Sequence, residues 1–159
     1  MRDSILLILH KIFTRIHRYI LHLLGASTVG VRAIVINTNQ EVLIVKHTYR
    51  PGWFLPGGGV KNGETAYDAI KRELYEETGI ILLEEPILYD IYFHVFMGVN
   101  DYPITFIVKK FKVTKINDPE IEEIMWCPIN KLPLDITPGS KNRINEFSNN
   151  CIQRNRLWN

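Results

Sequence analysis

The sequence has few cysteines, little net charge and no long apolar run, and each of these absences excludes a class of protein. Only Cys127 and Cys151 are cysteines among 159 residues. Because no signal peptide precedes them, we expect both thiols to be reduced in the cytoplasm. The net charge of +2 and the scattered basic residues argue against a stable nucleic-acid partner. With no internal repeat or low-complexity linker, this length predicts one globular domain.

The N-terminal segment, residues 4–24, has the pattern of an amphipathic helix. One side is apolar and the other carries basic residues. The apolar side comprises Ile5, Ile8, Leu9, Ile12, Ile16, Tyr19, Ile20 and Leu23, and the basic side Lys11, Arg15 and Arg18. Polar residues interrupt the apolar runs too often for a membrane span. We therefore predict an extension over residues 1–26 that packs on its own domain, forms a homodimer, or makes peripheral contact with an anionic membrane surface.

The remainder, residues 27–159, alternates strand and helix patterns typical of an α/β domain with a mixed sheet. Strands are predicted over residues 28–37, 41–47, 87–97 and 104–114, with a turn at Asn100 and Asp101 between the last two, and a final strand within 119–128. Helices are predicted over residues 65–78 and from Thr137 onward, the second burying Ile144, Phe147 and Cys151. The near-continuous apolar character of the first two strands predicts a sheet covered by helices on both faces.

The helix over residues 65–78 carries an unusual group of acids. At about 100° per residue, Glu73, Glu76 and Glu77 project from one stripe. Like charges at this spacing destabilise a helix, and acids near its C-terminus oppose the helix dipole. A solvated acidic face is the ordinary explanation, but the stripe borders the apolar face that includes Ile70 and Leu74, where unpaired charge is costly. A bound Mg²⁺ or Mn²⁺ would remove that cost.

A glycine-rich turn precedes this helix. Gly58, Gly63 and Thr65 match the pattern of a phosphate-binding P-loop, except that Glu64 stands in place of the lysine. A carboxylate cannot grip a phosphate directly. The turn is therefore expected to present backbone groups to a metal, which in turn holds the phosphate.

The turn and the helix together resemble the signature of the Nudix hydrolases, G-x5-E-x7-R-E-U-x-E-E-x-G-U, in which U is apolar. Every specified position matches, namely Gly58, Glu64, Arg72, Glu73, Leu74, Glu76, Glu77, Gly79 and Ile80. The resemblance implies the Nudix α/β/α sandwich. It also implies a Mg²⁺- or Mn²⁺-dependent pyrophosphohydrolase that cleaves a diphosphate linkage in a nucleotide or nucleoside-diphosphate derivative by attack of an activated water on phosphorus.

The same resemblance assigns roles to individual residues. The metal ligands would be Glu73, Glu76, Glu77 and the backbone carbonyl of Gly58. Arg72 would orient the carboxylates, while Glu64 would steady the turn and Gly79 would end the helix. The general base would be either Glu73 or Glu120, the latter lying outside the signature.

Substrate contacts and the reaction itself have alternatives. Tyr49, Arg50 and Trp53 flank the signature and are candidates for binding phosphate or base, or for purely structural roles. The aromatic residues Tyr89, Tyr92, Phe93 and Phe96 could stack on a base, although core packing is the commoner role. A non-catalytic nucleotide-sensing module and a prenyl-diphosphate isomerase share the family fold. The isomerase would need a catalytic cysteine, whereas we expect Cys127 to be a core residue.

Overall fold

The computed structural model describes residues 16, 19–20, 23–115, 118–152 and 155–159. The elements in chain order are β1 (Ser27–Val35), β2 (Glu41–His47), β3 (Trp53–Phe54), α2 (Ala66–Thr78), β4 (Ile80–Leu82), β5 (Ile87–Ile91), β6 (His94–Phe96), β7 (Val99–Val108), β8 (Phe111–Val113), β9 (Ile121–Pro128) and α3 (Pro138–Asn149). The elements predicted over residues 28–37, 41–47 and 65–78 are confirmed to within two residues.

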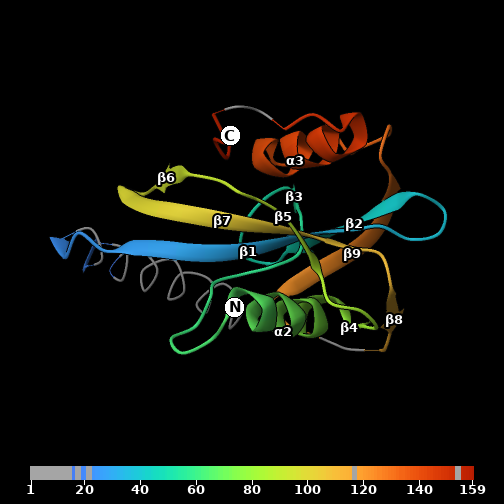
Figure 1. Ribbon diagram of the computed structural model, residues 1–159, viewed down its shortest axis with the longest axis horizontal. Helices are drawn as coiled ribbons and strands as arrows, with labels where there is room; N and C mark the ends of the chain where they lie inside the picture. The colour runs from blue at the N-terminus through green and yellow to red at the C-terminus, as the bar shows by residue number, and fades with distance from the viewer. Residues whose placement is uncertain (1–15, 17–18, 21–22, 116–117, 153–154) are drawn as a thin grey trace, which may run out of the picture.

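The strands pair in both directions, so the sheet is mixed as predicted (Figure 1). β1 runs parallel to β7, and β7 pairs antiparallel with β5 and β6. β2 lies between β3 and β9 and is antiparallel to both, while β4 pairs with β8. An antiparallel bridge between Ile36 and Val42 joins β1 to β2. The strand at the centre of this arrangement, β1, also runs beside the glycine-rich turn.

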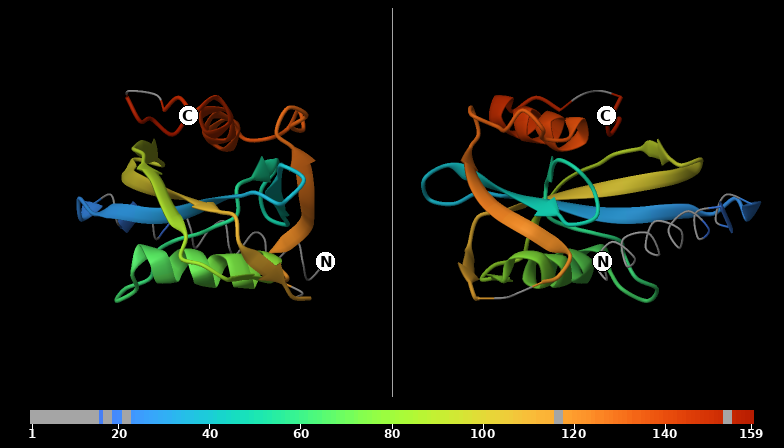
Figure 2. Two further views of the ribbon diagram at one scale, coloured as in Figure 1. Left: turned by 45° about the vertical axis from the view of Figure 1, so that its right-hand side comes forward. Right: turned by 180° about the vertical axis from the view of Figure 1, so that it is seen from behind.

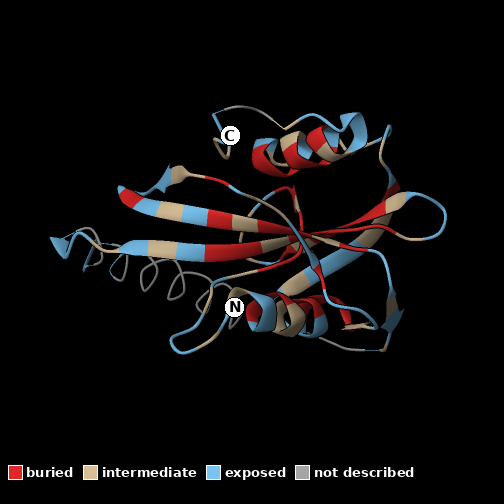
Figure 3. Ribbon diagram, viewed as in Figure 1, coloured by how far each residue is buried: buried red, intermediate tan, exposed pale blue. Residues whose placement is uncertain are grey.

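Helices α2 and α3 lie on opposite faces of the strands, which gives the α/β/α sandwich (Figures 1 and 2). In β1, Val31, Ala33 and Val35 belong to the core cluster under α2, whereas Ile34 belongs to the cluster under α3. Alternate residues of a strand face opposite sides, so a strand covered on both sides must be apolar at nearly every position. Figure 3 shows this burial along the middle of the strands.

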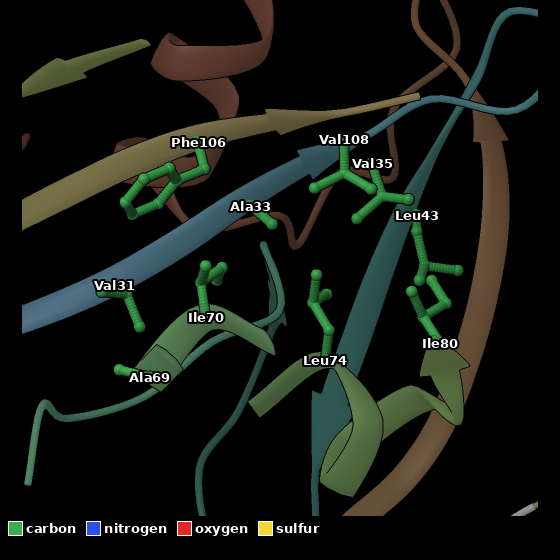
Figure 4. Close-up of a cluster of buried hydrophobic side chains, with 10 residues drawn as sticks. All are labelled: Val31, Ala33, Val35, Leu43, Ala69, Ile70, Leu74, Ile80, Phe106 and Val108. Atoms are coloured by element: carbon green, nitrogen blue, oxygen red, sulfur yellow. The ribbon is translucent and has the colours of Figure 1, made fainter. Parts of the chain in front are cut away.

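The cluster beneath α2 fixes the position of the acidic helix (Figure 4). Its buried members are Val31, Ala33, Val35, Leu43, Ala69, Ile70, Leu74, Ile80, Phe106 and Val108. Ile70 and Leu74 are fully buried; Glu73 directly precedes Leu74, and Glu77 follows it by three residues. Burial of each such side chain contributes about 1.5–3 kcal/mol, so the core anchors the face that carries the acids.

Local signals set the ends of α2. The Thr65 hydroxyl accepts a hydrogen bond from the Asp68 N–H at 3.1 Å and so caps the first turn. At the other end, Gly79 has a φ of 69°, and its N–H donates to the carbonyl of Tyr75 at 3.0 Å. This left-handed conformation suits glycine and ends the helix directly after the last acid of the signature. Gly79 therefore has the terminating role that the motif implies.

The predicted turn at Asn100 and Asp101 is wrong. Both residues lie in β7, and the two-residue hairpin turn is at Met97 and Gly98, which have φ values of 51° and 79°. Positive φ at both central positions is the hairpin geometry whose twist matches paired strands, and glycine adopts it without strain. The predicted strands 87–97 and 104–114 are correspondingly each divided, into β5 and β6 and into β7 and β8.

The C-terminal helix was predicted to bury three residues, and this is confirmed for two of them. Ile144 is fully buried and Phe147 packs against the same cluster. Cys151 is exposed, because α3 ends at Asn149 and Asn150 takes a left-handed conformation. Cys127 is a buried core residue in β9, and both thiols are free.

The predicted N-terminal helix lies mostly outside the described residues and stays a prediction. Of its apolar side, the structure describes Ile16, Tyr19, Ile20 and Leu23, and all four are exposed. Within the part of the chain that the structure describes, no helix is both long enough and apolar enough to cross a membrane.

Candidate active site

Arg72 is the centre of an ion-pair cluster on the exposed side of α2. Its Nε lies 2.7 Å from Glu64 Oε1, and its Nη1 lies 2.6 Å from Glu73 Oε1 and 3.0 Å from Glu76 Oε2. Its Nη2 donates to the Gly59 carbonyl at 3.1 Å. These charge-assisted bonds, that to Glu64 foremost, raise the pKa of Arg72. The arginine thus ties the acidic helix to the glycine-rich turn.

Glu64 faces inward to this cluster and holds the turn. Its carboxylate accepts from Arg72 Nε and Nη2, and from the Lys61 N–H at 3.0 Å. The bond from Arg72, followed by that from Lys61, lowers the pKa of Glu64 to about 2. Thr65, the next residue, caps α2, so the carboxylate that replaces the P-loop lysine fastens the turn to the start of the helix.

Glycine is required at two positions before the signature helix, because other groups approach the backbone too closely for a side chain to fit. Gly57 has a φ of 136°, and a Cβ on it would collide with the Val31 carbonyl. A Cβ on Gly58 would collide with the carboxylate of Glu73. The Gly58 carbonyl accepts from the Val31 N–H at 2.8 Å, which pairs the turn with β1. The predicted ligands Gly58 and Glu73 are therefore in direct contact.

Glu77 is the buried member of the acidic stripe. Its Oε2 accepts a hydrogen bond from the Gly57 N–H at 2.8 Å, and its Oε1 lies 3.9 Å from His47 Nε2. Burial raises the pKa of Glu77 to about 8. Burial also lowers the pKa of His47 to about 4, so the neighbouring imidazole is neutral and does not compensate the carboxylate. The site holds an acid whose ionised form needs positive charge from elsewhere.

The donor set fits a divalent cation that prefers oxygen ligands. Glu73, Glu76 and Glu77 are carboxylates on one stripe, Glu73 touches Gly58, and buried Glu77 gains most from a nearby cation. Within the described ranges, however, no three acidic, histidine or cysteine side chains converge on one point. Glu73 and Glu76 instead share Arg72. The assignment of Glu73, Glu76, Glu77 and the Gly58 carbonyl as metal ligands therefore stays a prediction.

The residues predicted to contact substrate divide into two groups. The Arg50 guanidinium lies 4.2 Å from the centre of the Phe54 ring and 5.6 Å from that of Tyr49. Its Nη2 is 3.4 Å from His47 Nε2, which places Arg50 and Tyr49 beside Glu77. Trp53, by contrast, is buried in the core beneath α3, and this assigns it a packing role rather than a substrate contact.

Glu120 lies on the same side as Arg50. Its backbone is held by the Thr48 N–H, which donates to the Glu120 carbonyl at 2.9 Å, and by its own N–H, which donates to Asp118. Burial lowers the pKa of Arg50 and raises that of Tyr49, and the negative charge of the exposed Glu120 carboxylate makes a smaller, raising contribution to each pKa. Glu120, which lies outside the signature, is thus brought toward the inner end of the stripe, the end at which Glu77 is buried.

The aromatic residues in and between β5 and β6 are mainly packed on protein. Tyr92 is buried and donates to Glu146 at 2.8 Å. The Tyr89 ring packs edge-on against Phe147. Phe96 is the exposed one, stacked on His94.

Three residues at the site escaped the sequence reasoning. The Gly57 N–H donates a hydrogen bond to the Glu77 carboxylate, and His47 lies between Glu77 and Arg50. The guanidinium of Arg32 donates to the Gly58 carbonyl at 3.4 Å. A third consecutive glycine was a usable signal for Gly57. Nothing in the local pattern marks Arg32 or His47, because each simply ends or interrupts an apolar strand.

Comparison with known proteins agrees with this geometry. Residues 26–147 match the model of the NUDIX domain. The chain is 35% identical over 130 residues to the "Putative 8-oxo-dGTP diphosphatase" of Bacillus subtilis (strain 168), covering 77% of this chain and 80% of that one. It is 46% identical over 51 residues to an RNA pyrophosphohydrolase of Psychromonas ingrahamii, covering 32% of this chain and 28% of that one.

Solved structures give the same result. The crystal structure of a MutT NUDIX hydrolase from Burkholderia pseudomallei matches with a TM-score of 0.67 and 25% identity, covering 75% of this chain and 96% of that one. A MutT protein from Bacillus halodurans matches with a TM-score of 0.66 and 25% identity, covering 82% and 85%. The chain therefore belongs to the Nudix hydrolase family, and it is an enzyme of the pyrophosphohydrolase class.

Proposed function

We propose that this enzyme uses Mg²⁺ or Mn²⁺ to hydrolyse a diphosphate linkage in a nucleotide or a nucleoside-diphosphate derivative. Nudix hydrolases generally use a divalent metal. The observation that carries the proposal is the contact of Glu73 with Gly58 beside buried Glu77, on a helix clamped to its turn by Arg72. Carboxylates in this setting suit a metal that also binds phosphate oxygens.

Glu73, Glu76, Glu77 and the Gly58 carbonyl would hold the metal. When bound, a divalent cation neutralises phosphate charge and lowers the pKa of a water molecule. The protein keeps Glu77 in place through the Gly57 N–H and keeps the helix against the turn through Arg72 and Glu64. These bonds position the acids before substrate arrives, which reduces the reorganisation needed for reaction.

In the reaction, water oxygen bonds to one phosphorus, the bridging P–O bond breaks, and the leaving phosphate takes its electron pair. The proton of the water passes to a general base. We assign this base to Glu120 rather than Glu73, because the Glu73 carboxylate is already bound by Arg72 at 2.6 Å and is one of the predicted metal ligands. Among the described residues, no cation pairs with the Glu120 carboxylate in this way.

Replacing Glu120 with glutamine is expected to lower kcat by about 10²-fold, the lower end of what general-base catalysis contributes, with little change in KM. Steady-state kinetics over a range of substrate concentrations measures this. Glu122→Gln is the matched control, because Glu122 lies only two residues further along, in β9, and pairs with Lys46 at 3.1 Å, away from the acidic stripe. Wild-type kcat in Glu120→Gln would assign the proton to Glu73 instead.

The proposed function is tested with a substrate panel of nucleoside di- and triphosphates, including 8-oxo-dGTP, together with nucleotide sugars, ADP-ribose, dinucleoside polyphosphates and 5′-triphosphorylated RNA. We expect phosphate or nucleotide release from at least one member with Mg²⁺ or Mn²⁺, and none after EDTA treatment until metal is restored. A flat response across the panel would favour a nucleotide-sensing module. Cys127 is buried and its thiol lies 3.1 Å from the Lys131 carbonyl, which argues against the isomerase.

A further inference from the structure

The five arginines that the structure describes divide into two groups. Arg72, Arg143 and Arg156 each pair with a carboxylate at 3.0 Å or less. Among the described residues, Arg32 and Arg50 have no carboxylate partner. Both belong to the site, at the inner end where Glu77 is buried. An arginine that is partly buried without a counterion is costly unless an anion joins it.

Arg50 occupies a half-buried position with an unused hydrogen-bond donor. Its guanidinium lies over the Phe54 ring, and its Nε is buried with no hydrogen-bond partner among the described residues. Its Nη2 lies 3.4 Å from Nε2 of His47. Because a buried N–H without a partner is unfavourable, this arrangement points to a missing acceptor.

Arg32 reaches the same place from β1. Its Nη1 donates to the carbonyl of Val31 at 2.7 Å and approaches that of Gly58 at 3.4 Å. This backbone contact holds the guanidinium beside the turn that supplies the predicted metal ligand. Arg32 therefore lies next to the predicted metal site and forms no ion pair with an acidic side chain among the described residues.

The two guanidinium groups are close enough to repel each other. Burial, followed by the charge of Arg32, lowers the pKa of Arg50. Both arginines also act on His47 and on Glu77. Glu77 and Glu120 also act on Arg50, but neither forms an ion pair with it. The inner end of the site thus holds two guanidinium groups that have no ion-pair partner among the described residues, beside ligands suited to a metal.

We propose that Arg32 and Arg50 together form an anion subsite that binds a phosphate group of the substrate. The proposal rests on the proposed function for the identity of the ligand, and it adds Arg32 as a binding residue. A planar guanidinium presents paired donors that match phosphate oxygens. A phosphate between the two arginines would provide the Arg50 Nε with an acceptor and remove their mutual repulsion.

The direct test is binding of inorganic tripolyphosphate to the full-length, metal-free protein in EDTA, measured by calorimetry at low ionic strength. We expect Arg32→Gln and Arg50→Gln each to weaken binding at least about 10-fold, as expected for loss of a charge-assisted contact. Arg156→Gln, which removes a surface arginine paired with Asp90, is expected to bind as the wild type does. Affinities within about 2-fold of wild type in both site variants would overturn the subsite.

Kinetics give an independent readout. Both glutamine variants should raise KM for the best panel substrate about 10-fold or more, and Arg32→Lys should recover part of the loss because the charge remains while the paired donors do not. If Arg32→Gln does not fold, Arg32→Lys and Arg50→Gln decide the matter. If the wild type is a metal-dependent hydrolase and both glutamine variants keep its KM and its affinity for tripolyphosphate, the anion subsite is overturned while the proposed function stands. Loss of tripolyphosphate binding in a protein that hydrolyses nothing would support the subsite and contradict the proposed function.

Discussion

Glu77→Gln is expected to abolish metal-dependent hydrolysis, lowering kcat by about 10³-fold or more. A bound metal stabilises the transition state by several kcal/mol, and each tenfold change in rate corresponds to about 1.4 kcal/mol of activation free energy, so loss of the metal gives a factor of this size. Glutamine has the same size, and its carbonyl can still accept the Gly57 N–H now held at 2.8 Å. The substitution therefore removes the charge from the site while keeping the turn in place. Initial rates at saturating Mg²⁺ measure the effect.

The same variant should fold normally, which separates lost chemistry from lost structure. Because the carboxylate is buried, its replacement by a neutral amide removes a desolvation cost. We expect the metal-free variant to unfold at no lower temperature than the wild type. Glu85→Gln is the matched control, since Glu85 is exposed and pairs with Lys71 away from the stripe. Glu76→Gln should also be inactive, and turnover retained in both signature variants would contradict the assignment of the metal ligands.

The second large effect is expected from Arg143 in α3, which is fully buried beneath the C-terminal segment. Its Nη2 donates to Glu146 at 3.0 Å, its Nη1 donates to the Leu157 carbonyl at 2.9 Å, and its guanidinium lies 4.0 Å from the centre of the Tyr92 ring. Arg143→Ala would remove the buried guanidinium that neutralises the Glu146 carboxylate. We expect the free energy of unfolding to fall by about 3–5 kcal/mol.

Urea denaturation of the wild type and the variant measures this loss. Arg156→Gln provides the control, because its ion pair with Asp90 at 2.8 Å is on the surface and should contribute about 1 kcal/mol or less. The double variant Arg143→Met with Glu146→Leu should recover part of the lost stability, since no charge is then left buried. A change below about 1 kcal/mol in Arg143→Ala would show that water reaches Glu146 once the arginine is removed.

The local elements were predictable because their signals lie within a few residues. Helical spacing placed Glu73, Glu76 and Glu77 on one stripe, and Gly79 ends the helix. Near-continuous apolar character located β1 and β2. The hairpin was misplaced because Asn100 and Asp101 are common turn residues, whereas positive φ at Met97 and Gly98 depends on how β6 and β7 pair.

The family could be predicted from the sequence alone, because the spacing of its carboxylates and glycines matches the Nudix signature, and that match in turn predicts a metal-assisted reaction at phosphorus. The surroundings of those carboxylates depend on the folded arrangement of the chain. It brings Gly57 to Glu77, places Arg32 and Arg50 at the inner end of the stripe, and buries Trp53 in the core. The physical reason is that helix periodicity is a local property of the chain. Contacts between β1, the segment after β2 and α2 exist only once the sheet has paired and the helix has packed against it.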